Sequence, residues 1–571
     1  MDSFRVVPHG GELVNLIVNS QRTCVLKKLS RDFESITLSN RQLSDLELLM
    51  NGGFSPLQGF MTRADYEPVI EHMRLKNGIL WPVPICLDVS ESEAGRLKKG
   101  QSVALRDREG FMLCVLHIED VWPIDKTYEA EKVYGTKDTR HPGVNYLINH
   151  IGTHYIGGSI EGIQYPLHFA FRRLRYTPVE IRSLYKKLGW RRIVGFHTRN
   201  PLHRAQFEIT LRAMSRAKAN LLLHPVAGSV KPGDIDTYTR IRCYMEVGRN
   251  YPPNMMLLSL LPLAMRMAGP REALLHAIIR KNYGCTHFII GRDHAGPGLR
   301  PDGSPFYDSD AAQKLVLAFE NELGIKIVPF EEMVYNVETN SHMPISEVSS
   351  GEQVRSLSDD SFHQKLRSGK PLPDWFTFPE VIDTLRKAYP PRHKQGFTIF
   401  CTGLSGAGKS TIARVLYARF LETGFRPVTL LDGDIVRHNL SSELGFSKEH
   451  RDINVRRIGF VAGEITKNRG IAICAPIAPY RDTRRQIRKT IEKYGGFIEV
   501  YVDTPLKICE KRDRKGLYAK ARAGLVKGFT GVNDPYETPE SAEVIIDTTD
   551  MTPDEAAQEV LLYLEHTSFI K

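Results

Sequence analysis

Apolar and polar positions alternate differently in successive stretches of the chain. Over roughly the first 170 residues the apolar runs are short, as in Ile79–Leu87, Ser102–Leu105 and Met112–Leu116, and glycine, proline and charged turns separate them. Runs of this length between turn residues are typical of strands. The pattern predicts a strand-rich N-terminal domain over residues 1–170.

A regular alternation of apolar strands and amphipathic helices begins near Arg192. It predicts strands at 193–196, 220–225 and 286–291 and helices at 205–217 and 271–282. Strands that alternate with helices favour a parallel, Rossmann-like α/β sheet, which we expect over 171–325. The polar stretch 326–393, which ends in two prolines and three basic residues, is interpreted as a small connecting α/β domain and linker.

A further α/β pattern occupies residues 394–571. The apolar runs 397–401 and 428–431 predict buried strands, and 411–422 predicts a helix between them. About 180 residues is a usual size for one such domain with a parallel sheet. Because 571 residues exceed what one hydrophobic core accommodates, we expect an α/β multidomain protein with these four parts.

A glycine-rich loop joins the first strand and helix of the last part. Residues 403–410 read Gly-Leu-Ser-Gly-Ala-Gly-Lys-Ser, the spacing of a phosphate-binding loop in its required strand–loop–helix setting. Backbone N–H groups would hold phosphate oxygens, Lys409 would reach the β- and γ-phosphates, and Ser410 would ligate Mg²⁺. The predicted ATP-binding residues are Gly403, Ser405, Gly406, Ala407, Gly408, Lys409, Ser410, Thr411 and Arg512.

Two carboxylates and a set of basic residues follow this loop. Asp432 and Asp434 come directly after the strand at 428–431, where they could hold Mg²⁺ and take a proton from an attacking hydroxyl. The basic residues are Arg437, Arg451, Arg456 and Arg457, with Asn454 among them, and they could form an anion clamp for a second charged substrate. A solvated helix face has a similar composition, so that alternative stays open.

The central part has two polar loops that each follow a predicted strand. One is Phe196–Gln206, with Arg199 and His203, and the other is Gly291–Gly298. Because the carboxyl ends of parallel strands share one edge of a sheet, the loops suggest one nucleotide site between them. Ordinary polar connections are the alternative, since a loop at a strand end need not be a site.

Composition narrows the class of partners. The net charge of +11 suits small anionic substrates, and no dense basic run or aromatic–basic platform indicates nucleic acid. None of the eight cysteines forms a C-x-x-C pair, so neither a zinc ribbon nor a disulfide framework is suggested. The longest apolar segment, Met255–Met267, is too short to span a bilayer, and the first residues do not resemble a secretory signal. We expect a cytoplasmic protein without a membrane partner.

Several motifs of the last part occur together in one known family. They are the phosphate loop, Leu431–Asp434, Leu444–Ser447, Asn454–Arg457, Ile477–Arg481, Lys515–Tyr518, Phe529–Gly531 and Asp534–Glu537. Residues 394–571 thereby resemble adenylylsulfate (APS) kinase, which uses ATP to phosphorylate the ribose 3′-hydroxyl of APS and gives PAPS. The resemblance implies Asp434 as base, Asp432 at Mg²⁺ or sharing that role, and a lid at 512–531.

The same resemblance implies a binding site for APS. The implied contacts are Arg437, Phe446, Arg451, Asn454, Ile477, Lys527 and Phe529. The two phenylalanines would enclose the adenine, while Arg437, Arg451 and Asn454 would hold the phosphosulfate and ribose. Ala478 departs from the serine of many such kinases, which excludes a phosphoserine intermediate at that position.

A second set of motifs covers residues 1–390. It comprises Pro8–Gly11, Met50–Leu57, Leu174–Pro178, His224–Val226, Lys231–Asp234, Met267–Ala273, Gly291–Gly298 and Leu366–Gly369. This part resembles ATP sulfurylase, which joins sulfate and ATP into APS and pyrophosphate. The resemblance implies a PUA-like N-terminal domain and a Rossmann-like nucleotidylyltransferase domain. The implied site residues are His197, Thr198, Arg199, Asn200, His203, Gln206, Arg292, His294 and Ala295.

The sulfurylase-like loop departs from the family at two positions. His197 replaces the glutamine of Gln-x-Arg-Asn, which together with the arginine holds sulfate in the family. Gln206 replaces the second histidine of His-x-x-His, whose imidazoles meet the ATP phosphates. Gln206 can donate a hydrogen bond but carries no positive charge, and loss of one stabilising donor can cost ~10²–10³ in rate. We therefore expect a weakened or silent sulfurylase site that still binds a nucleotide.

These observations leave four hypotheses. The first is an active APS kinase fused to a sulfurylase-like domain of uncertain competence, and the second is a bifunctional enzyme that also uses sulfate and pyrophosphate. The third is a sulfurylase with a PAPS-binding regulatory domain, which the intact phosphate loop disfavours. The fourth, a generic nucleotide kinase, is remote. By analogy with the families we expect a homo-oligomer, from a dimer to a hexamer.

Overall fold

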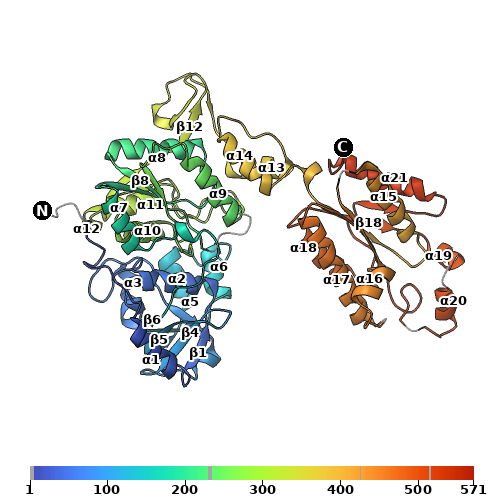
Figure 1. Ribbon diagram of the computed structural model, residues 1–571, viewed down its shortest axis with the longest axis horizontal. Helices are drawn as coiled ribbons and strands as arrows, with labels where there is room; N and C mark the ends of the chain where they lie inside the picture. Colours follow the sequence, from blue (N-terminus) through green and yellow to red (C-terminus); the bar gives the residue numbers. More distant parts are fainter. Residues whose placement is uncertain (1–5, 229–234, 425, 446, 514–515, 527) are drawn as a thin grey trace. The chain divides into compact units, whose positions relative to one another are not determined.

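The computed structural model describes residues 6–228, 235–424, 426–445, 447–513, 516–526 and 528–571 (Figure 1). The chain divides into two compact units. The first unit contains the residues up to Ser358 together with Leu372–Leu385, and the second contains Asp359–Pro371 and the residues from Arg386 onward. Each unit is described by itself.

A mixed sheet forms the N-terminal part of the first unit. Its strands within the described residues run in the order β1 (Glu34–Thr37), β4 (Ser102–Arg106), β5 (Met112–Pro123), β6 (His154–Gly162) and β2 (Gly59–Phe60), with β3 (Leu87–Val89) also on β6. Only the β1–β4 pair is parallel among these strands. The helices are α1 (Ser20–Leu29), α2 (Asn40–Asn51), α3 (Arg63–His72), α4 (Glu91–Ala94), α5 (Lys126–Tyr134) and α6 (Pro142–Asn149).

Two of the three predicted strands here are confirmed, and the third is wrong for most of its length. The run Ile79–Leu87 enters the sheet only at Leu87 and otherwise makes one isolated bridge, from Leu80 to Arg74. Pro82 and Pro84 lie inside the run, and proline has no N–H to donate to a ladder. The run is apolar because it is buried: Leu80, Trp81, Val83 and Ile85 are at most 1% exposed.

A parallel sheet forms the central part of the first unit. Its order over the described chain is β11 (Lys326–Pro329), β10 (His287–Ile290), β7 (Ile193–Phe196), β8 (Asn220–Leu223) and β9 (Met256–Leu258). The predicted strands and helices are confirmed, with ends that differ by a few residues. The helices are α7 (Pro178–Lys187), α8 (Arg204–Ala217), α9 (Thr237–Gly248), α10 (Gly269–Asn282), α11 (Ala311–Ala318) and α12 (Glu320–Leu323).

The N-terminal and central parts share one hydrophobic core, which runs from α2 and β5 to α10 and β10. A buried ion pair crosses between them, Arg266 Nη2 to Asp45 Oδ2 at 2.7 Å. Beyond β11, the antiparallel strands β12 (Met333–Asn336), β13 (Ser341–Pro344) and β14 (Val354–Arg355) form a small sheet. Helices α13 (Asp359–Ser368) and α14 (Pro379–Ala388) follow.

The second unit contains a parallel sheet between two layers of helices (Figure 1). In its described part the order is β16 (Val428–Asp432), β17 (Ile471–Ala475), β15 (Phe397–Thr402), β18 (Gly496–Val502) and β19 (Val544–Ile546). Helices α15 (Lys409–Thr423) and α21 (Pro553–His566) share one core cluster, and α17 (Lys448–Lys467) and α18 (Arg481–Ile491) share another. The remaining helices are α16 (Gly433–Leu440), α19 (Leu506–Arg512) and α20 (Leu517–Arg522). Among the described residues, no helix has both the length and the apolar character needed to cross a bilayer.

Candidate active sites

The glycine loop of the second unit has the backbone shape of a phosphate cradle. Gly403, Gly406 and Gly408 have φ angles of 144°, 76° and 108°, which side chains disfavour. A Cβ at Gly403 would lie 2.5 Å from the carbonyl oxygen of Val502, so only glycine fits there. Lys409 is buried at the start of α15 and its Nζ donates to the carbonyl oxygens of Gly403 and Leu404, at 2.9 and 2.7 Å.

Two threonines that sequence reasoning missed support this loop. The carbonyl oxygen of Ala407 accepts hydrogen bonds from Oγ1 of Thr504 and Thr548, at 3.1 and 2.9 Å. Arg512 donates to Oγ1 and to the carbonyl oxygen of Thr548, at 2.7 and 2.8 Å. The structure therefore brings the predicted Arg512 to the glycine loop through Thr548. A lone threonine at a strand end carries no motif, so no sequence signal could have identified either residue.

Oxygen donors suited to Mg²⁺ lie on the two elements that the sequence indicated. Ser410 is half-buried in the first turn of α15, and Asp432 is buried at the end of β16. A hydroxyl and a carboxylate fit a hard cation, which prefers oxygen ligands. Arg414 Nη2 lies 3.9 Å from Asp432 Oδ2. Asp434 is in the first turn of α16, and its side chain lies outside the described part.

A second cluster of polar groups lies where α17 meets the segment 529–537. Arg451 donates to Oγ1 of Thr530 at 2.6 Å and to the hydroxyl of Tyr480 at 2.8 Å, and pairs with Asp534 at 2.9 Å. Arg451 Nε and Asn454 Oδ1 are both buried without a hydrogen-bond partner among the described residues. Leaving such groups unpaired is costly, so this cluster fits a ligand that pairs with them.

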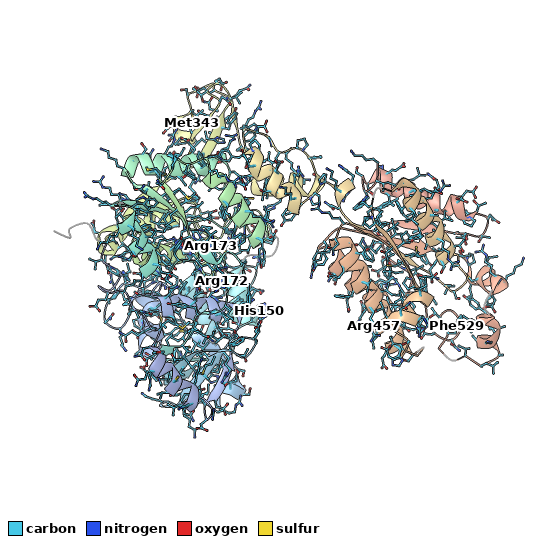
Figure 2. The ribbon with its side chains drawn as sticks, viewed as in Figure 1. His150, Arg172, Arg173, Met343, Arg457 and Phe529 are labelled. Atoms are coloured by element: carbon cyan, nitrogen blue, oxygen red, sulfur yellow. The ribbon has the colours of Figure 1, made fainter. Side chains whose placement is uncertain are left out.

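The other predicted contacts for APS are placed less tightly. Arg437 Nη1 donates to the carbonyl oxygens of Leu444 and Gly445, at 2.8 and 3.1 Å. Ile477 is half-buried just after β17, and Phe529, labelled in Figure 2, is half-buried. The rings of Phe529 and Tyr518 meet edge to face, with centroids 5.0 Å apart. Phe446 and Lys527 lie outside the described residues.

A cavity of about 710 Å³ borders the glycine loop at Leu404. Residues 501–506, after β18, form one wall, and residues 531–536 form the other. It contains none of the predicted substrate-binding side chains, so it is an adjoining space rather than the predicted site.

In the first unit the two polar loops converge. His197 follows β7 and His294 follows β10, and their ring centroids are 5.3 Å apart. A third ring, His276 of α10, lies 4.2 Å from His197 and donates to or accepts from His294 Nε2 at 3.0 Å. Burial is the main cause that lowers the pKa of each of the three histidines, so all three rings are neutral at neutral pH.

Ring nitrogens of these three histidines all lie within 4.8 Å of one another, as in a metal site. The neighbouring Arg280 argues against a cation. Its Nη2 donates to His197 Nδ1 at 2.7 Å, so the lone pair of Nδ1 is used, the ring proton of His197 is at Nε2, and neither nitrogen offers a free lone pair. A metal ligand needs a free lone pair, and the guanidinium charge repels a dication. The cluster fits a hydrogen-bonded group of neutral rings better than a metal centre.

Hydrogen bonds between side chains and its backbone hold the loop after β7. Thr198 Oγ1 accepts from the N–H of Asn200 at 3.2 Å, and Arg240 Nη1 donates to the carbonyl oxygen of Arg199 at 2.6 Å. Arg199 itself points to Met267, with Nη1 3.2 Å from the sulfur. These contacts place Arg199 and Asn200 at the carboxyl end of the parallel sheet, as predicted.

Both ends of the His-x-x-Gln sequence are engaged in the structure. His203 is buried, its Nδ1 lies 2.9 Å from Oγ1 of Thr377, and its ring packs 4.4 Å from that of Phe376. Gln206 is the third residue of α8, and its Oε1 accepts from the N–H of His203 at 3.1 Å. This is the geometry of a helix-capping glutamine.

The loop after β10 carries the remaining predicted residues. Arg292 is exposed and donates to Oγ of Ser309 at 2.9 Å, and Ala295 has a left-handed backbone with φ of 58°. The structure therefore brings His197 and His294 together, whereas the Arg292 side chain pairs with Ser309 and Glu332 in this conformation.

Comparison with known proteins covers nearly the whole chain. A family model for a PUA-like domain matches residues 6–165, one for ATP-sulfurylase matches 172–388, and one for adenylylsulphate kinase matches 395–547. These matches confirm the predicted fold class.

Full-length relatives have the same order of domains. A sulfate adenylyltransferase of Mycosarcoma maydis is 48% identical over 570 residues, 99% of each chain, and one of Phaeosphaeria nodorum is 49% identical over 563 residues, 98% of each. A solved structure described as a hexameric APS kinase from Thiobacillus denitrificans is 40% identical, with a TM-score of 0.81 over 99% of this chain and 100% of that one. The chain therefore belongs to the sulfate adenylyltransferase family and joins PUA-like, ATP-sulfurylase and adenylylsulphate kinase domains in one polypeptide.

Proposed function

We propose that the second unit transfers the γ-phosphoryl group of ATP to the ribose 3′-hydroxyl of APS and so makes PAPS. The observation that carries this proposal is a pair of buried atoms without hydrogen-bond partners among the described residues, Arg451 Nε and Asn454 Oδ1. Both belong to α17, which packs against β15, β16 and β17. The Nε–H of Arg451 can donate to an oxygen of the phosphosulfate, and Asn454 Oδ1 can accept from a ribose hydroxyl. Because Asp534 already pairs with the guanidinium, the proposal depends on this unpaired N–H and not on an unneutralised charge.

The proposed mechanism assigns one task to each residue. The N–H groups of 403–410 and Lys409 hold the ATP phosphates. Ser410 and Asp432 would hold Mg²⁺, which would supply positive charge against those phosphates. Asp434 takes the proton of the ribose 3′-hydroxyl while the oxygen of that hydroxyl forms a bond to the γ-phosphorus. The bond from that phosphorus to the β–γ bridging oxygen breaks, and ADP leaves.

Kinase activity is tested directly by MgATP-dependent conversion of APS to PAPS. We expect Lys409→Ala to abolish it, and Lys489→Ala, at an exposed position of α18, to leave it unchanged. Asn454→Ala should raise KM for APS more than it lowers kcat, because the contact is made in the ground state. Undiminished PAPS formation by Lys409→Ala would contradict the site assignment.

For the first unit we propose a weakened ATP sulfurylase. Gln206 is engaged as a helix cap and brings no charge to the ATP phosphates, whereas the convergence of His197 and His294 supports retained nucleotide binding. The assay is ATP formation from APS and pyrophosphate, measured by luciferase in Lys409→Ala protein so that the kinase cannot consume APS. A slow but measurable rate is expected. A rate typical of sulfurylases would favour the fully bifunctional enzyme instead.

We further propose that the four domains have the boundaries predicted from the sequence. We also propose that the chain forms a homo-oligomer. Ile453 and Phe460, seven residues apart on α17, expose 40% and 67% of their surface on one helix face. Burying such a face against a second copy is favourable, and the related structure is described as hexameric. Phe460→Glu should lower the mass measured by mass photometry, whereas Leu562→Glu on α21 should not. An unchanged mass in Phe460→Glu would contradict this interface.

A further inference from the structure

Arg280 is a buried cation without a carboxylate partner among the described residues. Its side chain is 0% exposed within α10, and burial lowers its pKa to about 10, so it stays charged at neutral pH. Nη2 donates to His197 Nδ1 at 2.7 Å and to the carbonyl oxygen of His224 at 3.1 Å. Burying a charge costs free energy, so its placement behind His197 calls for a reason beyond packing.

The contact fixes the tautomer of His197. A guanidinium has donors only, so Nδ1 of His197 must accept, and the single proton of a neutral imidazole is then at Nε2. His197 is half-buried at the carboxyl end of β7, so its ring reaches the surface of the site. His197 therefore presents one N–H group, at Nε2, and the Arg280 guanidinium behind the ring holds it in a fixed orientation.

We propose that Arg280 is a positioning residue that holds His197 as an N–H donor, and that this N–H binds a sulfate oxygen. It would replace the amide of the glutamine that is usual at this position. The inference rests on the proposed sulfurylase-like site and deepens it: the oxyanion pocket is preserved by a different donor, while the loss at Gln206 affects the ATP phosphates. The site would then bind sulfate better than it turns it over.

Binding is measured without turnover by equilibrium dialysis of [³⁵S]sulfate. The full-length protein is saturated with Mg²⁺ and α,β-methylene-ATP, which cannot be cleaved between the α- and β-phosphorus atoms and also fills the glycine loop of the kinase. We expect wild type and His197→Gln to bind sulfate with similar affinity. His197→Leu should bind about tenfold to a hundredfold more weakly, because a hydrogen bond to a charged group is lost.

The pH profile separates a positioning role from a structural one. The titratable and charged groups around His197 are Arg280 and His276 of α10, His294 after β10 and His224 after β8. With Arg280 present, affinity should be constant from pH 6 to 8. In Arg280→Met the ring gains a proton more easily, so affinity should rise as the pH falls through this range.

Each outcome decides the inference. Equal binding by wild type and His197→Leu would overturn it, and so would binding by His197→Gln without binding by wild type, although the site assignment would then survive. Binding by none of the three proteins would overturn the site assignment as well. An affinity of Arg280→Met that is as constant from pH 6 to 8 as that of wild type would overturn the positioning role of Arg280. If Arg280→Met fails to fold, the three proteins that differ at position 197 still decide whether the His197 N–H binds sulfate.

Discussion

Acid should destabilise the first unit through its buried histidines. His224 and His276 are 0% exposed, and burial holds the pKa of both below the ordinary value of about 6.5. The unfolded chain therefore binds more protons than the folded chain below pH 6.5, and stability falls as the pH falls through that value. At pH 5.5 a buried ring that stays neutral costs about 1.4 kcal/mol, and at pH 7.5 the cost is close to zero.

Tryptophan fluorescence reports this loss selectively. All four tryptophans, Trp81, Trp122, Trp190 and Trp375, belong to the first unit. Urea unfolding at pH 7.5 and 5.5 should therefore give the change in its free energy of unfolding without interference from the kinase unit.

The matched variant is His224→Phe. Both ring nitrogens of His224 are buried without partners among the described residues, and its ring packs 4.5 Å from Tyr283, so an apolar ring loses no hydrogen bond. Other titrating groups contribute equally to both proteins. The loss between pH 7.5 and 5.5 should be smaller by about 1.4 kcal/mol in His224→Phe. An equal loss in both proteins would refute the argument that His224 stays neutral.

Three further predictions follow from single contacts. Gln206→His in a kinase-inactive chain should raise the rate of ATP formation from APS and pyrophosphate by about tenfold or more; no change would show that the lost charge is not limiting. Arg484→Met, which removes a partner from the buried carboxylate of Glu499, should lower the stability of the kinase unit by about 3 kcal/mol in calorimetry, and a loss below 1 kcal/mol would contradict this. Thr548→Val should raise KM for ATP in PAPS synthesis, because it removes the hydroxyl that links Arg512 to the carbonyl oxygen of Ala407; an unchanged KM would show that this link does not support the glycine loop.

Periodicity was sufficient for the fold wherever strands are buried on both faces. The runs at 193–196 and 397–401 correspond to β7 and to all but the last residue of β15, since parallel strands need apolar residues at every position. The run Ile79–Leu87 has the same apolar character without the pairing. Hydrophobicity reports burial, and only the prolines within this run indicate that its backbone cannot join a ladder.

The candidate sites were predictable in proportion to how local they are. The glycine loop is one contiguous segment, so its spacing identifies it completely. Arg280 and His276 lie in a segment that the sequence predicts only as a helix, and their role depends on His197, which lies 83 residues before Arg280 in the chain. Thr548 is the equivalent case in the kinase, because it lies 141 residues after Ala407 in the chain and yet donates to its carbonyl oxygen. Residues that support a motif from a distance have no local pattern.

The two substitutions in the sulfurylase-like loop have opposite physical consequences. At position 197 the family's glutamine, whose amide donates a hydrogen bond, is replaced by histidine. The buried Arg280 keeps the histidine ring an N–H donor as well. At position 206 the family's histidine, which can carry positive charge, is replaced by a neutral glutamine whose Oε1 takes part in the capping box of α8. Under the proposed function, the exchange at 206 removes charge stabilisation from the reaction while the capping contact stabilises the helix, which is the usual opposition between active-site chemistry and stability. A weakened sulfurylase of this kind need not unfold, because its core is continuous with the N-terminal part and does not depend on the loop.

Gln206→His should accordingly increase the rate of ATP formation and lower the urea midpoint of the first unit together. A variant that gained in both rate and stability would refute this account.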